Sequence, residues 1–177
     1  GGASAAKVKK LREYPVQLRQ IGRTYDDAER AAFSHRDRHG SVFISPYNDP
    51  WVIAGGGTVG LEILEDQKRF DAMIVPVGGG GLISGISTWI KAKSPRTRIY
   101  GAQSVASPTM HRSLRAGKIV SVRIRPSLAD GLAGNLDPAT RTFSICKKNL
   151  EEILLVSESE IQKTIRWALL ELHQVIE

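Results

Sequence analysis

The feature that most constrains the fold is an apolar run that ends in four consecutive glycines and continues with helical spacing. Residues 70–95 read FDAMIVPVGGGGLISGISTWIKAKSP. Residues 72–77 are apolar throughout, which is typical of a parallel strand buried on both faces. After the glycines, apolar residues recur every three or four positions, at Leu82, Ile83, Ile86, Trp89 and Ile90. The stretch therefore predicts a strand, a glycine loop and a helix in direct succession.

Strand and helix signals alternate along most of the chain. Further strands are predicted at 97–103 and 151–156, with shorter ones at 16–19 and 41–45 and a turn at 46–50. Helices are predicted between Thr24 and Gly40, at 51–67, at 108–117 and at 138–150. The last helix opens with a capping box, Ser157 and Glu160. Its predicted buried face comprises Ile161, Ile165, Ala168, Leu169 and Leu172. The alternation predicts an α/β fold with a largely parallel sheet flanked by helices.

Composition narrows the classes of partner. No apolar run is long enough to cross a bilayer, the start lacks the apolar centre of a signal peptide, and Cys146 stands alone. We therefore expect a soluble protein in a reducing, cytoplasmic setting, with no membrane partner. Residues 91–129 carry nine Lys and Arg and no acid, within a net charge of +7. Only Tyr100 in that stretch could stack on bases, so a solvated or covered surface is favoured over nucleic-acid binding.

The four glycines, Gly78, Gly79, Gly80 and Gly81, predict an anion site. They follow the carboxyl end of a predicted strand and precede a helix N-terminus, where backbone N–H groups and the helix dipole favour negative charge. Glycine lets the backbone approach an oxygen closely. The plainer interpretation is that the glycines only form a tight turn from strand to helix. One or two glycines would suffice for that turn, whereas this chain has four. No Gly-Lys-Ser/Thr follows, as a Walker loop requires, and the next strand ends in Gln103 rather than in the acid of a dinucleotide fingerprint.

Four segments, in this order, resemble the fold-type II pyridoxal-phosphate (PLP) enzymes, and above all the threonine/serine dehydratases and serine racemases. These segments are FISPYNDPWVIAGGGTVGLEILED, DAMIVPVGGGGLISGISTWIKAKSPRTRIYGAQ, LADGLAGN and EEILLVSESEI. The resemblance covers nearly the whole chain and implies part of the tryptophan synthase β-like fold. It implies that residues 1–46 belong to the family's smaller domain and residues 47–177 to its larger domain.

The resemblance also implies a cofactor site. Gly78 to Gly81 and Leu82 would bind the phosphate of pyridoxal 5'-phosphate through backbone N–H groups, and Asp130 and Gly131 would lie near its ring. The family's Schiff-base lysine and its Ser-Gly-Asn-His loop precede the region that matches this chain, and the segment that partners the pyridine nitrogen follows it. We therefore assign no catalytic residue to this chain. Binding of PLP by the chain alone is doubtful on this basis, and we expect no turnover by it.

Two departures bear on metals. Gln103 and Thr109 stand where racemases and dehydratases of the family place acids that help to bind a divalent cation. Neutral amide and hydroxyl groups are poor substitutes for carboxylates around a hard cation, so we expect no metal site.

Other chemistries have weaker support. Ser4 and Lys7 match a Ser-x-x-Lys pattern that is common by chance and that here lies at a terminus, so an esterase-like hydrolase is the least favoured alternative. Cys146 is expected to pack in the core. The favoured function is part of a threonine/serine dehydratase-like lyase, which eliminates water from a hydroxy amino acid to give a 2-oxo acid and ammonia. The main alternative is a non-catalytic remnant that binds a small phosphate-bearing ligand or other anion, or that self-assembles. In either case we expect a homo-oligomer, or else a rearranged packing of the residues before Tyr47, because part of the family's fold by itself would expose sheet edges and apolar surface.

Overall fold

The computed structural model describes residues 3–176 and divides into two compact units, Gly1–Ile44 and Ser45–Glu177. Each unit is described here by itself. That they correspond to the family's smaller and larger domains, with a boundary at 46/47, stays a prediction.

The first unit contains two helices, α1 (Ala5–Leu11) and α2 (Tyr25–His39). Thr24 precedes α2, as predicted, and forms a capping box with Asp27: Asp27 N–H donates to Thr24 Oγ1 (3.2 Å) and Thr24 N–H donates to Asp27 Oδ2 (3.1 Å). The Arg23 N–H, which also donates to this carboxylate, is the largest cause that lowers the pKa of Asp27 to about 2. Gly40 ends α2 in the left-handed conformation, as predicted.

Two predicted strands in this region are wrong. Residues 16–19 and 41–44 are coil, and Ser45 begins the second unit, also outside any strand. Local β-propensity was the only support for these strands. A strand exists only when a neighbour satisfies its backbone groups, and among the described residues no segment pairs with either stretch.

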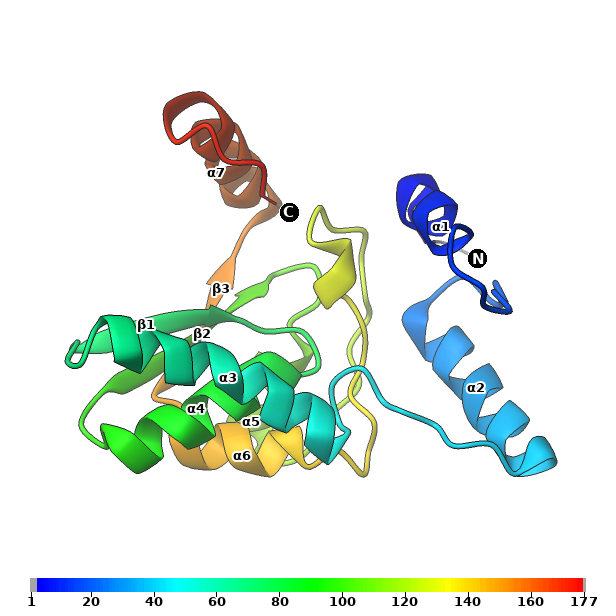
Figure 1. Cartoon of the computed structure of the whole chain (residues 1–177), viewed down its shortest axis with the longest axis horizontal. Helices are drawn as coiled ribbons and strands as arrows, with labels where there is room; N and C mark the ends of the chain where they lie inside the picture. Colours follow the sequence, from blue (N-terminus) through cyan, green and yellow to red (C-terminus); the bar gives the residue numbers. More distant parts are fainter. Residues whose placement is uncertain (1–2, 177) are drawn as a thin grey trace. The chain divides into compact units, whose positions relative to one another are not determined.

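The second unit is built on a parallel sheet in the order β1-β2-β3, formed by Ala72–Pro76, Arg98–Ser104 and Glu152–Val156. Helix α3 (Pro50–Asp66) precedes the first strand. Between and after the strands lie α4 (Gly81–Lys93), α5 (Thr109–Ala116), the 3-10 turn η1 (Asp130–Leu132), α6 (Thr142–Asn149) and α7 (Glu158–Glu171). Figure 1 shows α4 and α6 side by side along one side of the sheet. The predicted α/β class with a parallel sheet is confirmed.

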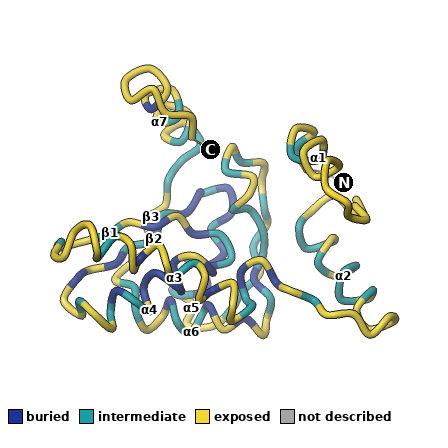
Figure 2. Tube along the Cα trace, viewed as in Figure 1, coloured by how far each residue is buried: buried dark blue, intermediate teal, exposed yellow. Residues whose placement is uncertain are grey.

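The two faces of this sheet differ in burial (Figure 2). Val75, Gly101 and Ile153 are in register and buried on the helix-covered face. On the opposite face Ile74 is 62% exposed and Leu154 is 40% exposed. The predicted strand is therefore present, but the predicted burial of both faces is wrong for the described residues.

Helix α3 packs closely on α4 because both carry glycine where they meet. A Cβ on Gly85 would lie 2.1 Å from the Ile53 carbonyl oxygen and 2.5 Å from the Gly57 nitrogen. A Cβ on Gly60 would lie 3.3 Å from the carbonyl oxygen of Ile86. Helix α3 is continuous through the glycines of the predicted helix at 51–67. Two of these glycines, Gly57 and Gly60, allow its backbone to pack closely against α4.

Helix α7 keeps its predicted start but not its predicted buried face. Glu160 N–H donates to Ser157 Oγ (3.3 Å), which completes the capping box with the reciprocal Ser157 N–H bond. Of the predicted face, Ala168 is buried, whereas Leu169 and Leu172 are half exposed. Apolar periodicity marks the face that a helix can bury, but burial also needs a packing surface, and the described residues provide little. Within residues 3–176, no helix is both long and apolar enough to cross a membrane.

Candidate anion-binding site

The glycine loop connects β1 to α4 at the carboxyl end of the sheet. Val77 N–H donates to the Ala102 carbonyl (2.8 Å), and α4 then begins at Gly81. Gly80 is the N-cap residue, with a φ of 88° that side chains with a Cβ disfavour. Its carbonyl accepts the first helical bond, from Ser84 N–H (3.0 Å). The loop thus turns the chain directly into a helix of 13 residues.

The loop leaves a row of N–H groups without acceptors. Within residues 3–176, no backbone or side-chain oxygen accepts a hydrogen bond from the amides of residues 78–83, and no side chain caps the start of α4. Helix N-termini carry partial positive charge, and orphan N–H groups there are ordinarily satisfied by side chains, water or ligands. Consecutive free amides at a helix N-terminus can bind an anion such as phosphate.

The back of the loop is held by residues whose role the sequence did not reveal. The ring of Tyr47 lies where a Cβ of Gly79 would stand, 2.4 Å from its nearest ring carbon, and the Tyr47 backbone leaves no room for a Cβ on Gly81. The buried Tyr47 accepts a hydrogen bond at its hydroxyl from Asp137 N–H (2.8 Å). Thr142, which is fully buried, donates from Oγ1 to the Gly79 carbonyl (2.7 Å). Some of the glycines therefore have a packing role as well. The sequence indicates only a turn at PYNDP, the segment that contains Tyr47.

The structure brings the loop at 127–132 beside the glycine loop. Asp130 and Gly131 lie in η1 and are exposed, and Leu132 completes that turn. A Cβ on Gly78 would lie 3.0 Å from the Leu132 Cα. The two segments assigned to one site are thus neighbours, although Leu132 follows Gly78 by 54 positions in the sequence. Leu82 is 42% exposed at the start of α4. That these residues bind the cofactor stays a prediction.

The two positions considered for a metal hold structural hydrogen bonds. Gln103 is buried and accepts a hydrogen bond at Oε1 from His111 N–H (3.0 Å), in the first turn of α5. Thr109 donates from Oγ1 to the Gly134 carbonyl (2.9 Å). Among the described residues, no three His, Cys, Asp or Glu side chains gather as a metal site would require.

Cys146 lies in the core, as predicted. Its thiol is fully buried beside the Ser84 hydroxyl (3.8 Å), and burial raises its pKa to about 12. A thiol held protonated in this way is a poor nucleophile.

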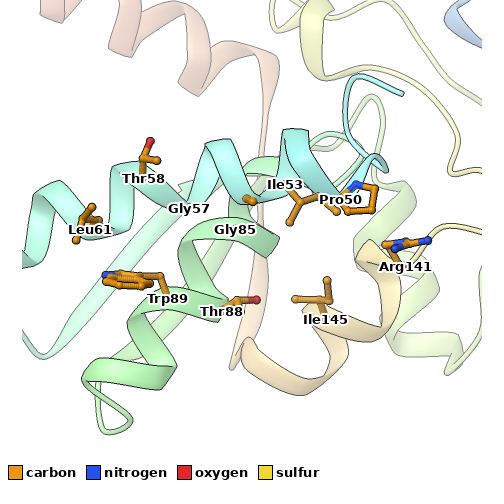
Figure 3. A pocket seen from close by; sticks show the side chains of 11 residues that line it. Pro50, Ile53, Gly57, Thr58, Leu61, Gly85, Thr88, Trp89, Arg141 and Ile145 are labelled. Carbon is orange, nitrogen blue, oxygen red and sulfur yellow. The ribbon is translucent and has the colours of Figure 1, made fainter. Parts of the chain in front are cut away.

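A separate groove of about 530 Å³ runs between α3, α4 and α6 (Figure 3). Ile53, Leu61 and Ile145 contribute to its apolar lining, and Arg141 lies at one end. The indole N–H of Trp89 is buried without a hydrogen-bond partner among the described residues. The groove has no arrangement of polar groups that resembles a reaction centre.

Comparison with known proteins identifies the family of the chain. The family described as "Pyridoxal-phosphate dependent enzyme" matches residues 1–177. The chain belongs to this family. It is 42% identical over 167 residues to the L-threonine ammonia-lyase of Thermotoga maritima, a match that covers 94% of the chain and 41% of that protein. It is 38% identical over 175 residues to L-threonine dehydratase catabolic TdcB of Escherichia coli K12. This match covers 99% of the chain and 53% of that protein.

Solved structures agree with these relatives. The serine racemase of maize superposes with a TM-score of 0.89 at 30% sequence identity, over 99% of this chain and 53% of that one. The chain thus spans about half, or less, of the length of the relatives that it matches. The predicted resemblance to fold-type II PLP enzymes is confirmed, and the family that includes this chain is PLP-dependent.

Proposed function

We propose that the chain is the part of a PLP-dependent threonine/serine dehydratase-like lyase that holds the cofactor phosphate. The reaction of the whole enzyme is the β-elimination of water from a hydroxy amino acid, which yields a 2-oxo acid and ammonia. The relatives named as L-threonine ammonia-lyase and L-threonine dehydratase support this reaction class. The observation that carries the proposal is the row of unpartnered amides at residues 78–83.

The residues present fit the phosphate end of the cofactor. Amides of Gly78, Gly79, Gly80, Gly81 and Leu82 offer donors at the positive end of α4, and no side chain of the described residues competes for them. Asp130 and Gly131, on the neighbouring loop, lie near the ring. When bound, PLP supplies an electron sink that stabilises negative charge at the substrate Cα. This chain contributes binding and orientation.

A titration of the ¹⁵N-labelled chain with inorganic phosphate, followed by NMR, tests the site. We expect saturable shifts of the amides of residues 78–82. Gly80→Ala should abolish them, because a Cβ at a φ of 88° distorts the loop. Gly117→Ala is the matched control: Gly117 also has positive φ, at the end of α5, and it has open space around it. If phosphate shifts surface lysines and arginines but not the loop amides, the proposal is wrong.

The chain alone should not turn over serine or threonine. Lys91 and Lys93 lie in the last turn of α4, at the end opposite the glycine loop, roughly 15–20 Å away for a helix of this length. Lys147 and Lys148 lie in the last turn of α6. We expect PLP and borohydride to leave no adduct on the pure chain. A fixed adduct together with production of 2-oxo acid would contradict this expectation.

Self-association of the chain is also proposed. Ile74 and Leu154 expose apolar surface on one face of the sheet, and Trp167 and Leu170 do so on α7. Such surface favours association in water. Light scattering coupled to size-exclusion chromatography should give a mass above that of one chain. The cytoplasmic setting stays a prediction.

A further inference from the structure

One carboxylate joins the end of the sheet to the loop that carries Asp130 and Gly131. Glu158 is the first residue of α7, just beyond β3. Its Oε1 accepts hydrogen bonds from Ser104 Oγ (2.6 Å) and Ser127 Oγ (2.8 Å), and its Oε2 accepts one from Leu128 N–H (2.7 Å). Ser104 is the last residue of β2, whereas Ser127 and Leu128 belong to the loop. The three donors come from two segments, the end of β2 and the loop at 127–132, and both are far from Glu158 in the sequence.

The ionised carboxylate suits this position because it only accepts hydrogen bonds. The bond from Ser104 is the largest cause that lowers the pKa of Glu158, followed by the bond from Leu128 N–H. Arg125, which precedes this loop by two residues, also favours the charged form. A neutral glutamine would place its NH₂ group against one of these donors.

Capping of α7 does not explain Glu158. The helix is capped by its neighbours, since Ser157 Oγ accepts from Glu160 N–H and Glu160 Oε2 accepts from Ser157 N–H (2.8 Å). Among the described residues, the hydrogen-bond donors to the Glu158 carboxylate all lie outside α7. Its hydrogen bonds therefore act on the loop.

The anchored segment leads directly to the glycine loop. Ser127 Oγ also accepts from Ala129 N–H (3.1 Å), and Leu132 N–H donates to the Ala129 carbonyl (3.0 Å), which forms η1. Leu132 then lies against Gly78. Fixing Leu128 thus limits where η1 can lie beside the anion site.

We infer that Glu158 is a positioning residue, which holds the loop at 127–132 so that Asp130 and Gly131 face the cofactor ring. The inference rests on the proposed function for the site, but its first measurement needs no ligand. Among the described residues, no hydrogen bond joins Glu158 to the glycine loop, so its effect should be specific to the ring side.

The test compares Glu158→Gln with Glu160→Gln in the whole chain. Both substitutions remove one charge from the first turn of α7, but Glu160 serves only the cap. Hydrogen exchange at the Leu128 amide should accelerate about tenfold or more in Glu158→Gln and stay within twofold in Glu160→Gln. Ser127→Ala should give a smaller change in the same direction.

Ligand binding gives the second readout. Glu158→Gln should weaken binding of pyridoxal 5'-phosphate about tenfold and binding of inorganic phosphate less than twofold, because only the former has a ring. Unchanged exchange at Leu128 would overturn the inference. Faster exchange with an unchanged ratio of the two affinities would also overturn it, since the anchor would then be purely structural. If the wild type binds neither ligand, the proposed function fails separately, and the exchange rates alone decide whether Glu158 holds the loop.

Discussion

Two runs of three or more consecutive glycines lie in the chain, and they serve opposite purposes. Gly55, Gly56 and Gly57 lie inside α3, where their backbone groups belong to a helix. Gly78 to Gly81 end a strand, and their amides have no acceptor among the described residues. In α3 the missing Cβ of Gly57 lets another helix approach, whereas in the loop the backbone itself is left open.

The comparison shows that a run of glycines has no single meaning. A Cβ on Gly57 would lie 3.2 Å from the Gly85 carbonyl oxygen, but one on Gly55 would meet nothing within 4 Å. Even within one run, neighbours therefore differ in what they do. Substitution by alanine distinguishes three cases: close helix packing, loop geometry and no requirement at all.

The largest effect is expected at the contact between α3 and α4. Gly85→Ala places a Cβ 2.1 Å from the Ile53 carbonyl oxygen, and both groups are parts of helices that must move apart. We expect a loss of about 3 kcal/mol or more in the free energy of unfolding, measured by urea denaturation. A loss below about 1 kcal/mol would show that α3 and α4 are not packed this closely.

A smaller effect is expected behind the glycine loop. Thr142→Val keeps the shape of a fully buried side chain but removes the donor to the Gly79 carbonyl. We expect a loss of about 1–3 kcal/mol in the same denaturation assay, together with weaker phosphate shifts at the loop amides. Thr142→Ser, which keeps the hydroxyl, is the control and should retain the phosphate shifts. Equal loss of those shifts in both variants would show that the hydroxyl does not hold the loop.

The pH dependence of the free energy of unfolding tests the packing of Cys146, which lies in α6 beside Ser84 of α4. Burial raises its pKa in the folded state from the ordinary 9.0 to about 12. The folded state therefore favours the protonated thiol more than the unfolded state does. The contribution of this thiol to the free energy of unfolding is fully present below pH 9 and is lost as the pH rises from about 9 towards 12. Cys146→Ala should lack this part of the pH dependence. In the native chain at pH 8, labelling by a thiol reagent should be slow, and Gly85→Ala should accelerate it.

Much of the fold could be predicted because it depends on local signals. The strand and helix around Gly78 to Gly81, the helix start at Thr24, the capping box at Ser157 and the end of α2 at Gly40 all follow from residue types at fixed spacing. Each is decided within a few residues of the chain. The same holds for the free amides, since a glycine-rich helix start offers no capping side chain.

The rest depends on contacts between distant segments. The strands predicted at 16–19 and 41–45 failed because pairing needs a partner that local propensity does not reveal. Tyr47 and Thr142 are sequence neighbours of neither each other nor Gly79, yet they hold it from behind. Nothing in the sequence distinguishes Glu158 from other acids, and only the fold shows that its partners are Ser104, Ser127 and Leu128.

The smallest effect, with the opposite sign, is expected at Gly55. This residue is exposed in the interior of α3, and a Cβ there would meet nothing within 4 Å. Alanine should raise the free energy of unfolding by about 0.5–1 kcal/mol, because it restricts the unfolded chain more than glycine and fits the helix. Urea denaturation of Gly55→Ala beside Gly85→Ala measures both in one assay. A destabilised Gly55→Ala would mean that this face of α3 is covered in solution, which would place a partner on the helix where the isolated chain shows open space.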